Sequence, residues 1–532
     1  MVGSADAGAT VTATGVDAAL PVRRRMGGPE RLMYLAEQTY GGTFRIATVL
    51  TLCSPNPLTA ARLTAAIDAV AARHDALRTV VIGQEFVVAP PTATPTVDVK
   101  AVAEDAEGVT AAAFADAQSV LAAGTSGAWT NPPLPAGAAA HTPISLPWRA
   151  GVYLPAPGST HAPTDAAAVV YYLPHYLSDG TSVDVLAAAT IDALTAASSA
   201  GVVAAGQVGM AAAGEVVPLA PAVNDVYPPQ GGGLLGMAAG LLRFASEVAA
   251  PVTRRHRRAL VFPPGPPATP ATRTASAIDA VVSAAALRRF AAAARAAGTT
   301  VGCGLVAALA VALDGVGVMA PSGSDIAVDV PINGRVGAPA GSGLTPTTVG
   351  CYVGAGIVDV PLAGGAYRDG GGDPPDLWAL ASKVHAAVHA PGYRASELSA
   401  FGVLSAILTC GPGRALVRSV INSTTEQGRI MPPTVSNVGR CGLSDAANGR
   451  AVAAAAAAPA GAAGGDGANG GFPTVGAIRL MDWEAQMGAP LILYACSVAG
   501  AMTLVLTSTQ PQVPTATAGA MLASVVKTIE AA

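Results

Sequence analysis

The most distinctive chemical grouping in the sequence is His175 with Asp179 and Gly180, which follows the apolar run 167–173 and Pro174. Histidine exchanges protons near neutral pH, so it suits a general base. An aspartate four residues later can hold the local backbone if a cation pairs with it. Glycine lets backbone and substrate approach closely. The spacing therefore fits proton removal from an attacking hydroxyl or amine, although a plain turn after the strand fits these residues equally well.

Two other groupings suggest different chemistry and are weaker. His385 and His389 are four residues apart on a predicted helix, as in zinc sites, but Ala386 replaces the glutamate of zinc peptidases and no third ligand is evident. We therefore expect no metal. Gly302 and Gly304 imitate a dinucleotide fingerprint, but no strand precedes them, so we expect helix packing. The absence of G-x-S-x-G and of a P-loop disfavours the usual serine hydrolases and P-loop NTPases.

The elements that must position these residues alternate between strands and helices. The run 167–173 predicts a buried strand and 182–196 a helix, which places His175 at a strand end. Strands and helices in two successive blocks indicate an α/β fold with mixed sheets rather than a helix bundle. In the second block we expect helices at 284–297, 299–313 and 376–389, strands at 277–282, 326–331 and 349–360, and a hairpin of 491–495 with 501–508.

Composition narrows the class of protein. The chain has 532 residues, enough for two domains, and a net charge of −4 gives no reason to expect a nucleic-acid partner. Six scattered cysteines without a C-x-x-C pair suit a reducing, cytoplasmic compartment. Asp6 and Asp17 precede the first arginines, which leaves organelle targeting a weak alternative. The apolar stretch 301–320 approaches the length of a membrane span, but Asp314 favours a buried helix.

Shifts in composition predict where the chain divides. The linker contains an apolar stretch, 234–248, close to an arginine cluster, 254–258; contact with a membrane surface is possible there, but a solvated helix is favoured. The predicted parts are a flexible tail at 1–27, an N-terminal domain at 28–225, a linker at 226–272, and a C-terminal domain at 273–532 with a disordered Ala/Gly-rich insert at 443–471.

Several segments resemble one enzyme superfamily in the order of its motifs. With the His175–Gly180 motif they make the chain similar to HxxxD-type, CoA-dependent acyltransferases, and above all to condensation domains, alcohol O-acetyltransferases and polyketide-associated acyltransferases. Pro174 replaces the first histidine of the usual motif, and the D-F-G-W-G motif of plant BAHD enzymes is absent, which argues against that branch. The segments are 73–79, 298–301, 330–335, 436–439 and the hairpin around Gly500.

The resemblance implies two chloramphenicol-acetyltransferase-like domains that form a V with a tunnel between them. It also implies a monomeric acyltransferase that takes an acyl group from a thioester, acyl-CoA or an acyl carrier protein, and passes it to a small acceptor. A hydroxyl acceptor is favoured over an amine, and no bound cofactor is needed. Two alternatives remain: a catalytically silent binding module on the same scaffold, and a condensation enzyme for carrier-bound substrates.

The same resemblance assigns roles to residues. In such enzymes the histidine lies midway along the tunnel and acts as the general base. We expect a buried ion pair to hold the motif in place, and hydrogen-bond donors to stabilise the oxyanion. The residues are His175 as base, Asp179 and Gly180 as structural support, Arg335 as the partner of Asp179, and Ser436 and Asn437 as candidate oxyanion or tunnel residues.

Overall fold

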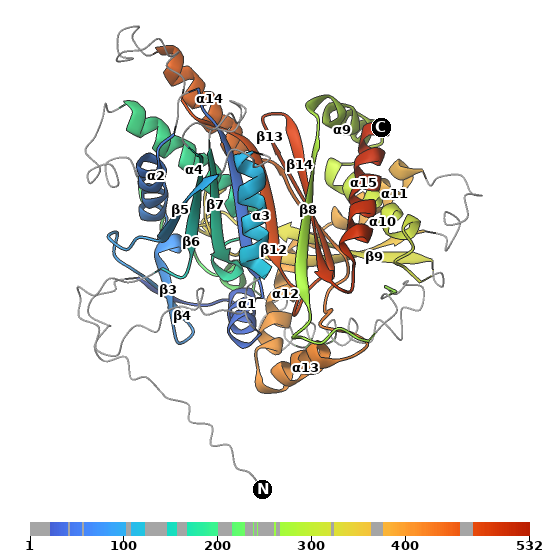
Figure 1. Ribbon diagram of the computed structural model, residues 1–532. Coiled ribbons are helices and arrows are strands. Elements are labelled where there is room, and N and C mark those ends of the chain that lie inside the picture. The colour runs from blue at the N-terminus through green and yellow to red at the C-terminus, as the bar shows by residue number, and fades with distance from the viewer. Residues whose placement is uncertain are drawn as a thin grey trace.

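The protein has a mixed α/β fold, the class predicted from its sequence, with helices packed around several sheets (Figure 1). The computed structural model describes residues 22–40, 43–55, 58–102, 108–122, 146–156, 167–199, 215–228, 238, 242, 260–261, 266–320, 324–362, 376–457 and 472–532.

The first large sheet has five strands in the order β12-β2-β7-β6-β5. Its pairs are antiparallel except for the parallel pair of β5 and β6. The inner strands β2 and β7 are buried nearly throughout, so neither sequence alternates between apolar and charged residues, and that of β7 is a continuous apolar run. The strands are β2 (Arg45–Cys53), β5 (Thr96–Val102), β6 (Arg149–Pro155), β7 (Ala167–Pro174) and β12 (Thr474–Trp483).

The second large sheet has six strands in the order β10-β9-β11-β13-β14-β8. The pairs of β11 with β9 and with β13 are parallel, and the others are antiparallel. The predicted hairpin is the pair β13 and β14. The strands are β8 (Thr274–Val282), β9 (Asp325–Asn333), β10 (Val353–Pro361), β11 (Thr434–Arg440), β13 (Leu491–Val498) and β14 (Ala501–Gln510).

Helices cover these sheets in separate groups. In Figure 1, α2 and α4 lie beside the first sheet, while α10, α11 and α15 lie together beside the second. The helices are α1 (Gly28–Thr39), α2 (Ala60–Arg73), α3 (Val109–Ala122), α4 (Gly180–Ser199), α6 (Val223–Val226), α9 (Ala284–Ala296), α10 (Val301–Gly315), α11 (Leu377–Val388), α12 (Tyr393–Leu408), α13 (Gly411–Asn422), α14 (Gly442–Ala457) and α15 (Thr515–Ala531).

Strand β13 separates two hydrophobic cores. Successive side chains of a strand point to opposite faces, so alternate residues of β13 belong to different cores. Ile492, Tyr494 and Cys496 belong to the core shared with the first sheet. Leu491 and Leu493 belong to the core beneath α10 and α15. The two sheets therefore pack on each other through one face of β13.

The predicted division of the chain does not match the sheets. Strand β12 comes from the part of the chain after residue 273, yet it pairs along its length with β2 of the first sheet. The register sets Asp482 opposite Ile46 and Trp483 opposite Arg45. A boundary between residues 225 and 273 therefore cannot separate the first sheet from the second.

The predicted tail at 1–27 is wrong at its C-terminal end. Arg23–Arg25 form strand β1, which pairs with β4 (Glu85–Val88); β4 also pairs with β3 (Thr79–Ile82). Arg24 donates to the buried carboxylate of Glu30 at 2.5 and 2.7 Å. That ion pair holds the segment in place. Residues 1–21 lie outside the described residues.

The predicted insert at 443–471 is wrong over its first half, because α14 is a helix packed on α4. Asp184 of α4 accepts from the backbone nitrogens of Leu443 and Ser444 at 3.0 and 2.8 Å, which satisfies the free amides at the start of α14. Ala447 and Ala451 are fully buried. Small side chains here allow close helix packing, so the alanine-rich composition does not mean disorder. Residues 458–471 lie outside the described part.

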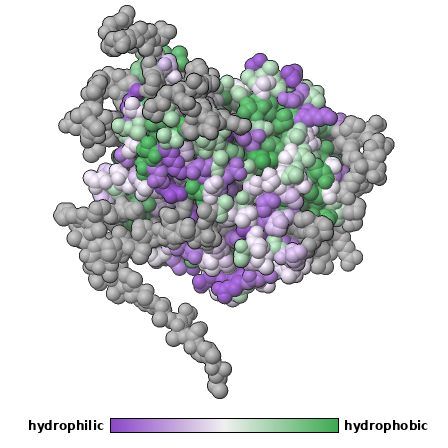
Figure 2. Space-filling view, viewed as in Figure 1, coloured by the Kyte–Doolittle hydropathy of each residue, from purple (hydrophilic) through white to green (hydrophobic). Residues whose placement is uncertain are grey.

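Helix α10 occupies most of the stretch 301–320, and Asp314 near its end is fully buried within the protein. Among the described residues, each helix taken singly is too short or too polar to cross a bilayer, and two sharply bent helix pairs meet the length and composition criteria only when joined. Figure 2 shows hydrophilic and hydrophobic residues interspersed on the described part of one face. Most of the linker predicted at 226–272, including 234–237 and 254–258, is not described.

Candidate active site

His175 begins a short 3-10 turn (His175–Leu177) directly after β7. Its backbone nitrogen donates to the carbonyl oxygen of Phe44 at 2.8 Å, and the Phe44 ring stands edge-on to the imidazole with centroids 6.4 Å apart. The imidazole Nδ1 lies 4.0 Å from the sulfur of Cys351. The histidine is thus fixed through its backbone and flanked on two sides, as expected for a residue at a strand end.

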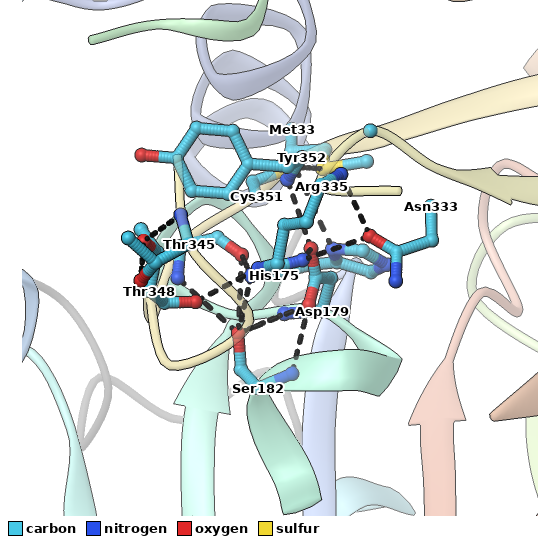
Figure 3. A network of polar contacts seen from close by, with 12 residues as sticks. Met33, His175, Asp179, Ser182, Asn333, Arg335, Thr345, Thr348, Cys351 and Tyr352 are labelled. Atoms are coloured by element: carbon cyan, nitrogen blue, oxygen red, sulfur yellow. Dashed lines mark hydrogen bonds and ion pairs between the residues drawn. The ribbon is translucent and has the colours of Figure 1, made fainter. Parts of the chain in front are cut away.

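Asp179 and Arg335 form the ion pair predicted from the sequence, and both side chains are buried (Figure 3). Arg335 Nη1 donates to Asp179 Oδ2 at 2.7 Å. The same carboxylate accepts from the backbone nitrogens of Tyr352 and Ser182, both at 2.9 Å. Arg335 also donates to the carbonyl oxygens of Thr348 and Gly350. The network joins the turn after His175 to the segment before β10.

The ion pair with Arg335 and the surrounding hydrogen bonds determine the charge of Asp179. Burial by itself would raise the pKa of the carboxyl, because the charged form loses its water. The Arg335 guanidinium and the hydrogen bonds from Tyr352 and Ser182 outweigh burial and hold the pKa of Asp179 below its usual value. Asp179 is therefore an ionised, fully satisfied anchor whose hydrogen-bonding capacity is directed away from substrate.

Gly180 brings the start of α4 close to strand β11. A Cβ at this position would lie 3.1 Å from Cγ2 of Val438 and 3.8 Å from Oγ of Ser436. The contact with Val438 would be tighter than an ordinary van der Waals contact. Gly180 therefore lets α4 approach the second sheet and shapes the cavity wall, the role expected for it.

A cavity of about 150 Å³ lies where the two sheets face each other. His175, Asp179 and Gly180 line it from the first sheet side, and Ser436 and Asn437 line it from β11. The structure therefore brings together five of the six residues chosen from the sequence, and Arg335 supports them through Asp179. The V-shaped pair of domains and the through-going tunnel stay predictions.

Ser436 and Asn437 differ in how free their side chains are. Asn437 Oδ1 accepts from the backbone nitrogen of Gly439 at 3.0 Å, which supports the bulge where β11 slips against β13. Its Nδ2 faces Gly302 at the start of α10, where a Cβ would come within 2.9 Å. Ser436 is opposite Tyr494 in the β11–β13 ladder, on the cavity side.

Three acidic residues of the cavity were missed by sequence analysis: Asp329, Asp482 and Glu484. Asp329 interrupts the apolar run of β9, and Asp482 and Glu484 alternate at the end of β12. A charge within a strand-like apolar run was the available signal. It could not be assigned to this cavity, since that depends on the long-range pairing of β12 with β2.

The other sequence candidates lie away from the cavity. His385 and His389 stack on α11 with ring centroids 4.0 Å apart, and the described residues contain no group of three ligands suited to a metal ion. Gly304 packs against Phe290, where a Cβ would lie 2.8 Å from the ring, so it serves helix packing as predicted. His74 is buried, and burial, with the charge of Arg73, lowers its pKa to about 3.

Comparison with known proteins gives matches at the level of structure only. No family model matches the chain, and no curated protein matches it. The structure is similar to TRI3 trichothecene 15-O-acetyltransferase from Fusarium sporotrichioides, with a TM-score of 0.64, 14% identity, and coverage of 98% of this chain and 97% of that one.

Two further solved structures are similar over almost the whole chain. Polyketide synthase associated protein 5 from Mycobacterium tuberculosis has a TM-score of 0.53 and 13% identity, covering 95% of this chain and 97% of its own. The first condensation domain of the CDA synthetase has a TM-score of 0.52 and 14% identity, covering 96% and 95%. With His175 and its buried ion pair at the meeting of two mixed sheets, the chain has the fold of the acyltransferase and condensation-domain superfamily.

Proposed function

We propose that the protein is an acyltransferase that moves an acyl group from a thioester, acyl-CoA in the first instance, to a hydroxyl group, with His175 as the general base. The observation that supports this most strongly is the position of His175. It lies on the wall of the cavity between the sheets, in a turn anchored by the Asp179–Arg335 pair.

The proposed reaction uses the imidazole twice. Nδ1 faces the Cys351 thiol, which leaves Nε2 for the substrate. Nε2 removes the proton as the acceptor oxygen attacks the thioester carbonyl, and a C–O bond forms. When the tetrahedral intermediate collapses, the C–S bond breaks and the thiolate sulfur receives the proton from the imidazolium. An ester and a free thiol result.

The oxyanion of the intermediate needs hydrogen-bond donors at the same wall. Ser436 and Asn437 line the cavity from β11, and Gly180 at the start of α4 lies close to the Ser436 hydroxyl. Donors fixed in advance stabilise developing charge without reorganisation. We assign this role to the Ser436 and Asn437 side chains together with backbone N–H groups near Gly180.

Thiol release from a panel of acyl-CoAs, in the presence of a mixture of alcohols, tests the proposal. We expect His175→Ala to lose about a hundredfold or more of the rate, because a positioned general base contributes that much. His385→Ala, which removes an imidazole of α11 that does not line the cavity, is the matched control and should retain the wild-type rate. Equal rates in wild type and His175→Ala would refute the general base.

A second arm of the same assay uses acyl groups loaded on a carrier protein. Activity with carrier-bound thioesters alone would assign the chain to carrier-dependent condensation chemistry, as in the condensation domains whose fold it shares. Binding of thioesters without thiol release from either donor would favour the silent binding module.

A further inference from the structure

The cavity has an acidic end that the proposed reaction does not use. Asp482 lies opposite Ile46 in the β12–β2 ladder, and Ile46 lies opposite Leu173 in the β2–β7 ladder. Directly opposed residues share a face of the sheet, so Asp482 projects on the same side as Leu173, two residues before His175. Glu484 follows on that face. Asp329 enters the cavity from β9 of the other sheet.

Two of these carboxyl groups are buried without complete hydrogen bonding. Asp329 is 4% exposed and Asp482 3% exposed. Thr434 donates to Asp329 Oδ2 at 3.3 Å, and the backbone of Gly356 and Val330 also forms hydrogen bonds with this carboxyl group. The Tyr494 hydroxyl and Glu484 share hydrogen bonds with Asp482. Oδ1 of each aspartate has no partner among the residues the structure describes. A buried acceptor without a partner is costly and uncommon, so each one calls for an explanation.

No lysine or arginine lines the cavity in the described part of the chain. The ionisable groups that face the acidic cluster are His175 from the end of β7, Tyr494 from β13 and Glu397 from α12. Burial raises the pKa of Asp329 to about 7 and also raises the pKa of Asp482 and Glu484. Burial therefore disfavours the charged forms of these carboxyl groups in the absence of a cation.

The arrangement does not suit a metal ion. A bound Ca²⁺ or Mg²⁺ requires several oxygens to converge within about 2.0–2.6 Å of one point, and no such group of three acidic, histidine or cysteine side chains occurs in the described residues. The carboxyl groups instead come from two sheets around a cavity of about 150 Å³. An organic cation, whose N–H donors point in several directions, fits this placement.

We propose that Asp329, Asp482 and Glu484 form a subsite for an acceptor substrate that carries a protonated amine. The ammonium group binds the carboxyl groups where these residues line the cavity, while a hydroxyl of the same molecule reaches His175. The inference rests on the proposed acyl transfer for the role of His175, but the binding itself does not need it. Ammonium–carboxylate contacts are charge-assisted and strong when water is excluded.

Isothermal titration of the full chain with straight-chain aminoalcohols and diols of matched length tests the subsite. The titrations are repeated on the His175→Ala variant, which is expected to lose acyl transfer, so that binding is measured without the reaction. We expect aminoalcohols to bind about tenfold or more tightly than diols, the effect of a charge-assisted hydrogen bond. Titration in two buffers of different ionisation enthalpy should show proton release, because the carboxyl groups ionise as the cation binds.

Variants identify the residues responsible. Asp482→Asn and Asp329→Asn should each lower aminoalcohol affinity about tenfold or more and leave diol affinity unchanged. Asp325→Asn, on the same strand as Asp329 but outside the cavity, is the matched control and should bind as wild type. Equal affinity for aminoalcohols and diols, no binding by the amine series, or full affinity in both cavity variants would overturn the subsite.

The outcomes also separate this inference from the proposed function. Selective aminoalcohol binding together with a thiol-release rate that does not depend on His175 would retain the subsite and reject the general base. Thiol release that depends on His175, with no preference for amines, would do the reverse.

Discussion

Two sets of buried carboxyl groups lie on one cavity, and they differ in compensation rather than in burial. Asp179 and Asp329 are both 4% exposed. Asp179 accepts four hydrogen bonds or ion-pair contacts from Arg335, Tyr352 and Ser182. Asp329 has no lysine or arginine beside it in the described part of the chain: Thr434 and the backbone of Gly356 and Val330 form hydrogen bonds with its carboxyl group, Oδ1 has no close partner, and burial raises its pKa to about 7.

This difference distinguishes carboxyl groups that stabilise the fold from carboxyl groups that are available to bind a ligand. A carboxylate whose lone pairs are all used by the protein stiffens the backbone and has little left for substrate. A carboxyl left partly unsatisfied lowers stability, and a ligand with donors can reverse that loss. Burial alone does not distinguish the two cases, whereas the partners do.

The prediction with the largest expected effect removes the cation that is paired with Asp179. Arg335→Met leaves Asp179 charged and buried, and we expect a loss of about 3–5 kcal/mol in unfolding free energy, measured by denaturant titration. Asp179→Asn in the Arg335→Met background should restore part of the loss, since the uncompensated charge is gone. Exchanging the two charges, Asp179→Arg with Arg335→Asp, tests the pair itself. No recovery in either double variant would contradict the pairing as the source of the effect.

The second prediction concerns the charge of Asp329, whose carboxyl group has no cation beside it. A carboxyl whose folded pKa is raised contributes stability that is present at low pH and is lost as pH rises through the folded pKa. Wild-type protein should therefore lose stability between about pH 4 and pH 7 through Asp329. Asp329→Asn should remove that slope and be the more stable protein above neutrality, by about 1–3 kcal/mol.

The measurement is the free energy of unfolding at several pH values, with Asp325→Asn as the control on the same strand. A pH dependence that is the same in Asp329→Asn and wild type would show that this carboxyl is compensated after all, and the contrast with Asp179 would disappear.

The smallest test uses a buried carboxylate with partners but without a cation. Asp184 binds the free amides at the start of α14. Asp184→Ala should cost about 1 kcal/mol, the usual effect of a lost helix cap, as a lower Tm. Asp192→Ala breaks the more exposed pair with Arg450 between the same two helices and should change Tm less. A larger loss from Asp192→Ala would reverse the ranking.

Local patterns were enough to predict much of the fold and part of the site. The run before Pro174 is β7, the stretch after Gly180 is α4, and the second-block helices and the hairpin lie near their expected bounds. The Arg335–Asp179 pair followed from the need of a buried carboxylate for a partner and from the resemblance. These features depend on periodicity, turn residues and charge pairing, which sequence displays directly.

Features that depend on contacts between distant segments of the chain could not be predicted from the sequence. Asp482 is in the cavity only because β12 joins the first sheet, and no local signal shows which strand a strand will pair with. Alanine-rich α14 was read as disorder, since small side chains look featureless until α4 is seen packed against them. Helices α12 and α13 were also missed.

The pairing of β12 with β2 has a consequence for biosynthesis. Hydrogen-bonding groups along β2 have no neighbour on that side until the ribosome has produced residues 474–483. An open strand edge invites pairing with other chains, and partly made α/β proteins are prone to that error. Until then this edge of β2 is open, and Asp482 reaches the cavity only when β12 docks.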